Sequence, residues 1–184
     1  MKIIAICCFT LFTMLAHSRE IALTFDDAPM GDGAFMSGDQ RTGKLISILK
    51  KSRVESVMLF ANTVHMDERG RARIQRYAKA GHYIANHSHS HRSASKIGVA
   101  AYLSDVDTAH KILAKFDNFL PYHRFPYLNH GADKKAITAI DVGLKRRGYK
   151  DGYVTVDNFD FYLNHLMSEA VNHHRAFDMA AAEY

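Results

Sequence analysis

The sequence predicts an α/β fold built on a parallel sheet, and three observations support this. Short apolar runs alternate along the chain with longer segments of helical periodicity, the order of elements found in parallel α/β folds. Polar motifs follow several of the apolar runs, as they do where strand ends carry a site. The chain has 184 residues, 47% of them hydrophobic and 23% charged, which suits one globular domain with a buried core.

The predicted elements follow from local patterns. Apolar runs that end at polar or turn residues predict strands at residues 20–25, 56–61, 82–85, 122–125 and 152–156. Apolar spacing of three and four, often closed by glycine, predicts helices. The predicted helices are a segment that reaches Lys51 through Leu45, Ile48 and Leu49, and then residues 69–80, 99–116, 134–147 and 162–182. The glycine-rich residues 28–43 are predicted to form a long loop, and long loops after strands often carry sites.

Residues 1–18 have the pattern of a secretory signal peptide. A lysine precedes an apolar stretch, and small residues follow at the positions that a signal peptidase reads. The stretch is short for a membrane span, so we expect a secreted or periplasmic protein without stable membrane insertion after cleavage. Both cysteines, Cys7 and Cys8, lie in this segment. The mature chain would therefore hold a metal through nitrogen and oxygen ligands only.

The formal net charge of +5 makes the chain mildly basic. No dense lysine and arginine block with interleaved aromatic residues is present, so we expect no nucleic-acid partner. A modestly positive surface is compatible with an anionic cell-wall glycan.

Alternating histidines are the strongest chemical signal. His87 and His91 have H-x3-H spacing, which on a helical turn places both imidazoles on one face, where a single ion can bind both. His89, in the middle of the alternation, is expected to point away. Catalytic zinc sites usually have a third protein ligand and an open position for water. Asp26 and Asp27, at the end of the first predicted strand, are the candidates for it.

Polar motifs follow most of the predicted strands. They occupy residues 26–27, 87–91, 124–127 and 157–160. In parallel α/β architectures such strand ends lie at the same edge of the sheet. We therefore expect these motifs to converge on one site.

Four motifs of this chain, taken in order, resemble the first four motifs of the NodB-type polysaccharide deacetylases, carbohydrate esterase family 4. They are TFDD from residue 24, HSHSH from residue 87, RFPY from residue 124 and DNFDF from residue 157. The resemblance covers most of the mature chain. It implies a distorted (β/α) barrel, a divalent metal that is usually zinc, with cobalt or nickel as alternatives, and hydrolysis of N-acetyl or O-acetyl groups from an N-acetylated glycan. Which glycan is the substrate, which metal is native and which oligomer forms stay open.

The resemblance also implies roles for single residues. Asp27, His87 and His91 would bind the metal, and Asp26 would be the catalytic base. One carboxylate would thus be neutralised by the ion while its neighbour stays free to take a proton from the attacking water.

Further roles fall on the third and fourth motifs. Arg124 would pair with the base and favour its ionised form. The backbone N–H of Tyr127 would help to stabilise the oxyanion. Asp160 matches the aspartate of the fourth motif. Taken singly, each of these residues is at least as readily a helix cap or a surface ion pair.

The fifth motif of the family, Leu-x-His, supplies the general acid. Leu163-Asn164-His165 has these letters but falls inside a predicted helix soon after Asp160, so we do not assign it that role. The chain also has fewer strands than a closed eight-stranded barrel requires. We therefore expect a deacetylase domain at residues 19–184 that is truncated, with a barrel incomplete at its C-terminus.

Two other functions stay open at this point. A catalytically impaired domain could bind metal and glycan without the general acid. A 2-His-1-carboxylate iron oxygenase has formally the same ligand set. Against it, the carboxylate is doubled, and oxygenases do not need a second, base-like aspartate.

Overall fold

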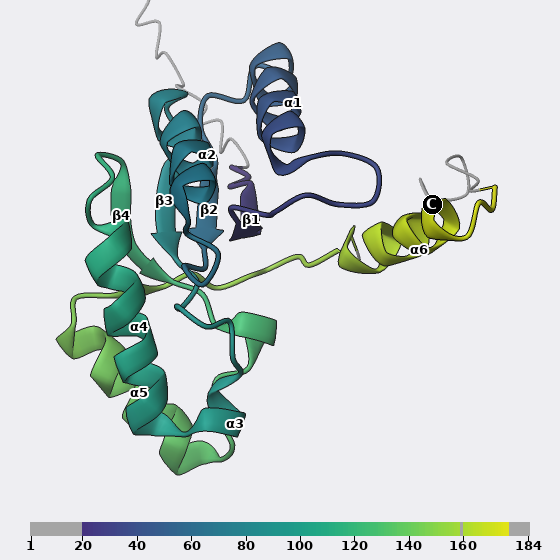
Figure 1. The fold of residues 1–184 in the computed structure, drawn as a ribbon. Helices are drawn as coiled ribbons and strands as arrows, with labels where there is room; N and C mark the ends of the chain where they lie inside the picture. Colours follow the sequence, from purple (N-terminus) through teal and green to yellow (C-terminus); the bar gives the residue numbers. More distant parts are fainter. Residues whose placement is uncertain (1–19, 159, 177–184) are drawn as a thin grey trace, which may run out of the picture.

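The computed structural model describes residues 20–158 and 160–176, and a parallel sheet forms its centre (Figure 1). The predicted signal peptide, with Cys7 and Cys8, lies outside the described residues. Within them the sheet has five strands in the order β1-β2-β3-β4-β5, and every neighbouring pair is parallel. The strands are β1 (Thr24–Ala28), β2 (Met58–Ala61), β3 (Tyr83–Asn86), β4 (Phe119–His123) and β5 (Lys150–Asp151). The sheet is open, because β1 and β5 are its edges.

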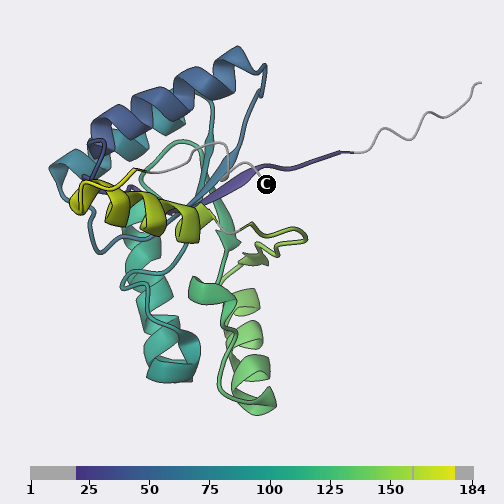
Figure 2. The same cartoon turned by 90° about the vertical axis from the view of Figure 1, so that its right-hand side faces the viewer.

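Helices connect the strands and cover the sheet. They are α1 (Gly38–Lys51), α2 (Glu68–Lys79), α3 (Ala94–Ile97), α4 (Val99–Leu113), α5 (Lys134–Arg146) and α6 (Asp160–Asn172), with a short 3-10 helix at Pro126–Leu128. Two views at right angles show α1 beside α2, and α4 beside α5, as separate pairs (Figures 1 and 2). None of the helices in the described part of the chain combines the length and hydropathy that a membrane crossing requires.

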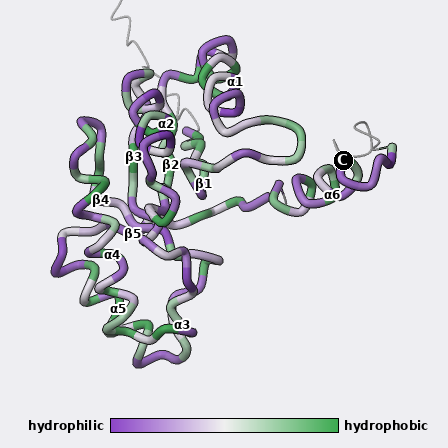
Figure 3. Tube along the Cα trace, viewed as in Figure 1, coloured by the Kyte–Doolittle hydropathy of each residue, from purple (hydrophilic) through white to green (hydrophobic). Residues whose placement is uncertain are grey.

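The helices begin where the sequence offers capping side chains. The Ser37 hydroxyl accepts from the Gln40 N–H, and the Gln40 side chain accepts in turn from the Ser37 N–H, which forms a capping box before α1. Asp67 and Asp133 cap α2 and α5 in the simpler way, through one side-chain oxygen. Hydrophobic and hydrophilic residues alternate along the helices, as expected of helices with one buried face (Figure 3).

The buried apolar side chains form two clusters. One lies between the sheet and the helices α1, α2 and α4, with Leu59, Ile74, Ile84 and Leu113 at its centre. The other lies between α3, α4 and α5 and is built around Tyr102 and Ile140. Both clusters lie behind the ends of the strands, so the core supports those ends from two sides.

The predicted order of strands and helices is confirmed, and so is the parallel α/β class. Several boundaries were wrong. β1 extends through both aspartates to Ala28, and α1 begins at Gly38, inside the predicted loop 28–43. β5 is limited to Lys150–Asp151, whereas a strand was predicted at residues 152–156. The helix α3 was not predicted, because four residues are too few to show a period.

The C-terminal part of the described chain leaves the sheet. After β5 an extended segment leads to α6, which lies to one side of the other elements (Figure 1). The predicted helix at residues 162–182 corresponds to α6, and residues 177–182 of that prediction lie outside the described part.

Candidate metal centre

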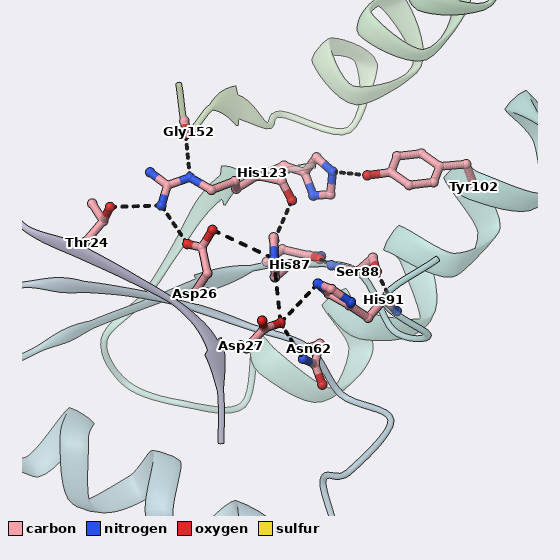
Figure 4. Close-up of polar contacts among 12 residues, drawn as sticks. Thr24, Asp26, Asp27, Asn62, His87, Ser88, His91, Tyr102, His123 and Gly152 are labelled. Carbon is pink, nitrogen blue, oxygen red and sulfur yellow. Dashed lines mark hydrogen bonds and ion pairs between the residues drawn. The ribbon is translucent and has the colours of Figure 1, made fainter. Parts of the chain in front are cut away.

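Side chains from three strand ends converge at one edge of the sheet. Asp26 and Asp27 belong to β1, His87 and His91 lie on the loop after β3, and Arg124 follows β4 (Figure 4). The topology explains the convergence, because β1, β3 and β4 belong to one sheet in which every neighbouring pair is parallel, so their carboxyl ends lie at the same edge. The motifs predicted to meet do so at this edge, except for the one at residues 157–160.

Asp27, His87 and His91 form a potential ligand set for a metal ion. Each offers one ligand atom, and these atoms all lie within 4.8 Å of one another. The Asp27 Oδ1 atom is 3.8 Å from His87 Nε2 and 3.0 Å from His91 Nε2. Ligand atoms about 2.0–2.1 Å from a tetrahedral zinc ion lie roughly 3.3 Å from each other, a separation that these two distances bracket. The donor set therefore fits a zinc-sized ion.

The backbone of Arg124 orients His87. The Nδ1–H of His87 donates to the Arg124 carbonyl oxygen over 2.8 Å, which leaves Nε2 as the lone-pair nitrogen facing the carboxylates. The ring is buried, and the edge of Phe60 lies against it. Burial lowers the pKa of His87, and this outweighs the nearby charges of Asp26 and Asp27, which act in the opposite direction. His87 is therefore held as the neutral imidazole that binds a metal.

Asp27 is held in its ionised form. Burial raises the pKa of its carboxyl, but the hydrogen bond and charge of His91, the charge of His87 and the Asn62 amide together lower the pKa below its usual value. The Asn62 Nδ2 group donates to Asp27 Oδ1 over 3.1 Å. Sequence reasoning missed Asn62, because an asparagine just after a strand is most often part of a turn.

Asp26 has a different partner. Its Oδ1 atom accepts from Arg124 Nη1 over 2.6 Å, and its Oδ2 atom lies 3.9 Å from His87 Nε2. Arg124 is itself fixed, because Nη1 also donates to the Thr24 hydroxyl and Nε donates to the Gly152 carbonyl oxygen. Two adjacent carboxylates thus face one site, one bound to histidine and the other to arginine.

The geometry of the H-x3-H segment was predicted wrongly. His87 and His91 do not lie on a helical turn. Residues 87–92 form an irregular loop in which Ser88 and His91 have φ angles of 69° and 53°. The imidazoles converge because of this folded-back loop. His89 points elsewhere, as expected, and its Nδ1 atom lies 2.7 Å from the Thr63 hydroxyl.

Two further predicted residues lie in different surroundings. Tyr127 belongs to the 3-10 helix, and its exposed ring lies against the edge of His91, with centroids 4.7 Å apart. The N–H of Tyr127 makes no hydrogen bond to another described residue. Asp160 is the first residue of α6, and the described contacts do not bring it to the cluster. Leu163 and His165 lie in α6 as well.

A protein-family model described as polysaccharide deacetylase matches residues 16–145, which is more than half of the chain. The chain belongs to the polysaccharide deacetylase family. This membership confirms the resemblance seen in the motifs, and it argues against the iron oxygenase interpretation.

Relatives of this polysaccharide deacetylase chain agree. A peptidoglycan-N-acetylglucosamine deacetylase of Bacillus cereus is 30% identical over 112 residues, which are 60% of this chain and 37% of that relative. A family 4 carbohydrate esterase of Streptomyces lividans, solved with acetate, has a TM-score of 0.61 at 20% identity over 77% of this chain and 66% of that one. The chitin deacetylase of Colletotrichum lindemuthianum has a TM-score of 0.61 at 24% identity over 82% and 62%.

The two structural likenesses establish the fold of the deacetylase chain. The chain spans about a third of the curated relative and less than two thirds of either solved structure.

Proposed function

We propose that this chain is a metal-dependent hydrolase that removes acetyl groups from an N-acetylated polysaccharide or cell-wall glycan. The observation that carries the proposal is the division of labour between the two carboxylates. Asp27 contacts both histidines, whereas Asp26 contacts Arg124 and stays outside the ligand set. A hydrolase of this kind needs both a ligand and a base.

We assign the ion to Asp27, His87 and His91, and we propose zinc, with cobalt or nickel as alternatives. Two imidazole nitrogens and one carboxylate leave an open position in a tetrahedral site. A divalent ion held there supplies Lewis-acid chemistry, because it polarises an acyl oxygen and lowers the pKa of water.

The remaining residues act on the acetyl group and on the attacking water. Asp26 accepts the proton of the water as its oxygen attacks the acetyl carbon, and the hydrogen bond from Arg124 keeps that carboxylate aimed at the site. The N–H of Tyr127 donates to the acyl oxygen as negative charge develops there. The C–N bond then breaks as the nitrogen takes up the proton that Asp26 had accepted, which gives acetate and an amine and restores the Asp26 carboxylate. Asp160 stays a prediction, since α6 lies apart from the cluster.

The setting of the enzyme belongs to the same proposal. The signal-like segment at residues 1–18 supports a secreted or periplasmic location, where cell-wall glycans are accessible. The relative from Bacillus cereus is named for an N-acetylglucosamine substrate, which supports N-acetyl over O-acetyl groups.

The test is acetate release from N-acetylated chito-oligomers and from peptidoglycan, with zinc added after treatment with a chelator. We expect zinc to restore activity. Asp26→Asn should keep zinc but lose about 100-fold or more in rate, and His87→Ala should lose both zinc and activity. Asp141→Asn is the matched control, because Asp141 is exposed on α5 and, within the described part of the chain, pairs only with Lys145. Equal activity in Asp26→Asn and the wild type would contradict the proposal.

A second candidate is a domain that binds metal and glycan without turnover. Leu163 and His165 have the residue types of the general-acid motif, but they lie on α6, apart from the site, and this position favours the second candidate. Stoichiometric zinc binding that is lost in His87→Ala, without acetate release by the wild type, would support this candidate over the enzyme.

A further inference from the structure

Every backbone N–H of the loop from His87 to His91 has a hydrogen-bond acceptor, and most of these acceptors are side chains. The acceptors are Ala61 O for His87 at 2.9 Å, Asn86 Oδ1 for Ser88 at 2.8 Å, Asp105 Oδ2 for His89 at 2.8 Å, both Asp105 carboxylate oxygens for Ser90 at 3.2 and 3.0 Å, and Ser88 Oγ for His91 at 3.1 Å. Buried N–H groups are nearly always paired, and an irregular loop, which has no helix or strand partner, must find its acceptors in other groups.

This loop needs the support because its backbone is strained. Ser88 and His91 have φ angles of 69° and 53°, in the left-handed region that residues other than glycine seldom adopt. Such conformations persist only where the surrounding structure imposes them. The strained bend is also what brings His91 Nε2 to 3.0 Å from Asp27 Oδ1.

Asp105 provides the largest share of this support. It lies on α4, far from the loop in sequence, and its carboxylate accepts from two successive loop N–H groups, His89 and Ser90. Hydrogen bonds to an ionised acceptor are stronger than neutral ones. Val106, the next residue of α4, accepts from Asn86 Nδ2, so the same helix also anchors the end of β3.

We propose that Asp105 is a positioning residue that holds the H-x3-H loop in its metal-binding conformation before the ion arrives. The inference rests on the proposed metal site. Without the carboxylate, the loop would have to be ordered by the ion itself, and part of the binding free energy would be lost in doing so. Outer partners of metal sites typically change metal affinity 10- to 100-fold when they are removed. We expect a loss of about tenfold for Asp105→Ala.

The experiment measures zinc affinity by competition with a chromogenic chelator, together with the thermal unfolding of the metal-free protein. Asp107→Ala is the matched control, because Asp107 lies on the same helix and, among the described residues, its carboxylate accepts only from Arg147, at 2.7 and 2.9 Å. Asp105→Asn keeps the shape of the side chain and one acceptor oxygen, so it should fall between the wild type and Asp105→Ala. It also keeps the test usable where the alanine variant is unstable.

A second readout separates positioning from general stability. Amide hydrogen exchange at His89 and Ser90 in the metal-free protein should accelerate at least tenfold in Asp105→Ala, with exchange in β2 and β3 unchanged. Zinc affinity within twofold of the wild type in Asp105→Ala, or an equal loss in Asp107→Ala, would overturn the role of Asp105. A wild-type chain that binds no zinc would instead overturn the metal site itself.

Discussion

Arg124 acts on the site through two separate parts of one residue. Its backbone carbonyl accepts from His87 Nδ1, and its guanidinium donates to Asp26. The guanidinium is buried, and its Cζ atom lies 3.9 Å from the centre of the Phe60 ring, so the ring also holds it in place. A side-chain substitution at Arg124 can therefore disturb Asp26 while the orientation of His87 is kept.

Replacing Arg124 by lysine should test this separation. Lysine keeps the positive charge but cannot make the Nε bond to Gly152 and the two Nη1 bonds at once. We expect kcat/KM for deacetylation to fall at least about tenfold while zinc affinity stays within about twofold. Steady-state kinetics and zinc competition on the same preparation check both values. A matching loss of zinc affinity would show that the two parts of the residue are not independent.

At the level of single residues, the sequence predicted much of the site. The residues placed in it by motif, Asp26, Asp27, His87, His91 and Arg124, do meet. Their supporting partners could not be found in this way, because Asn62 and Asp105 act over long sequence distances and belong to no local pattern. Only the fold brings them to the site.

Among the elements, the junction of β4 and β5 is tightly packed. Gly152 follows β5 directly, and its N–H donates to the His123 carbonyl oxygen over 2.7 Å. A Cβ atom at Gly152 would lie 2.5 Å from Phe60 Cζ and 3.1 Å from that oxygen. Because the Phe60 ring packs against the Arg124 guanidinium, a side chain at Gly152 that displaces Phe60 would also displace the guanidinium that pairs with Asp26.

Gly152→Ala should therefore lower both stability and activity. Overpacking in a core typically costs about 1–3 kcal/mol, and we expect a loss of that size in the free energy of unfolding. Chemical denaturation measures it, and acetate release measures the effect on the site. Gly31→Ala is the control, because a Cβ there would meet nothing within 4 Å, and it should change stability by less than about 0.5 kcal/mol. Equal effects of the two substitutions would contradict the packing argument.

The elements also show where local reasoning fails. The spacing of His87 and His91 fits a helical turn, yet the structure has an irregular loop there. Hydrogen bonds from the loop N–H groups to the side chains of Asp105 and Asn86 override the local preference, and a periodicity argument cannot include them. Similarly, β1 continues through Asp26 and Asp27 because it pairs with β2, although the apolar run stops before them.

For the whole molecule, the alternation of strands and helices was enough to predict a parallel α/β sheet and the edge on which the site lies. It could not predict how α6 is placed, because its residues show little burial against the other elements. Only Ala170 is buried among the described residues of that helix. Tertiary contacts, which sequence periodicity does not report, decide such positions.

The buried histidines should make the whole fold sensitive to acid. His123 is fully buried against the rings of Tyr102, Phe125 and Tyr149. Its Nε2 atom lies 2.8 Å from the Tyr102 hydroxyl, and its Nδ1 atom has no side-chain partner among the described residues. Burial, together with the nearby His87, lowers the pKa of His123 from 6.5 to about 3. Below pH 6.5 His123 therefore binds a proton in the unfolded chain but not in the folded chain, and the free energy of unfolding falls as the pH drops toward 3.

The expected size of this effect follows from the pKa difference. At pH 5 the contribution of His123 should be a loss of about 2 kcal/mol in the free energy of unfolding relative to pH 7.5. Burial lowers the pKa values of His82 and His87 as well, so the comparison must isolate one residue. Urea unfolding of the metal-free wild type and of His123→Gln at both pH values does so. The wild type should lose about 2 kcal/mol more than the variant between the two pH values, whatever the variant costs at pH 7.5. Parallel losses in the two proteins would mean that His123 is protonated in the folded state, and the acid sensitivity would then belong to other groups.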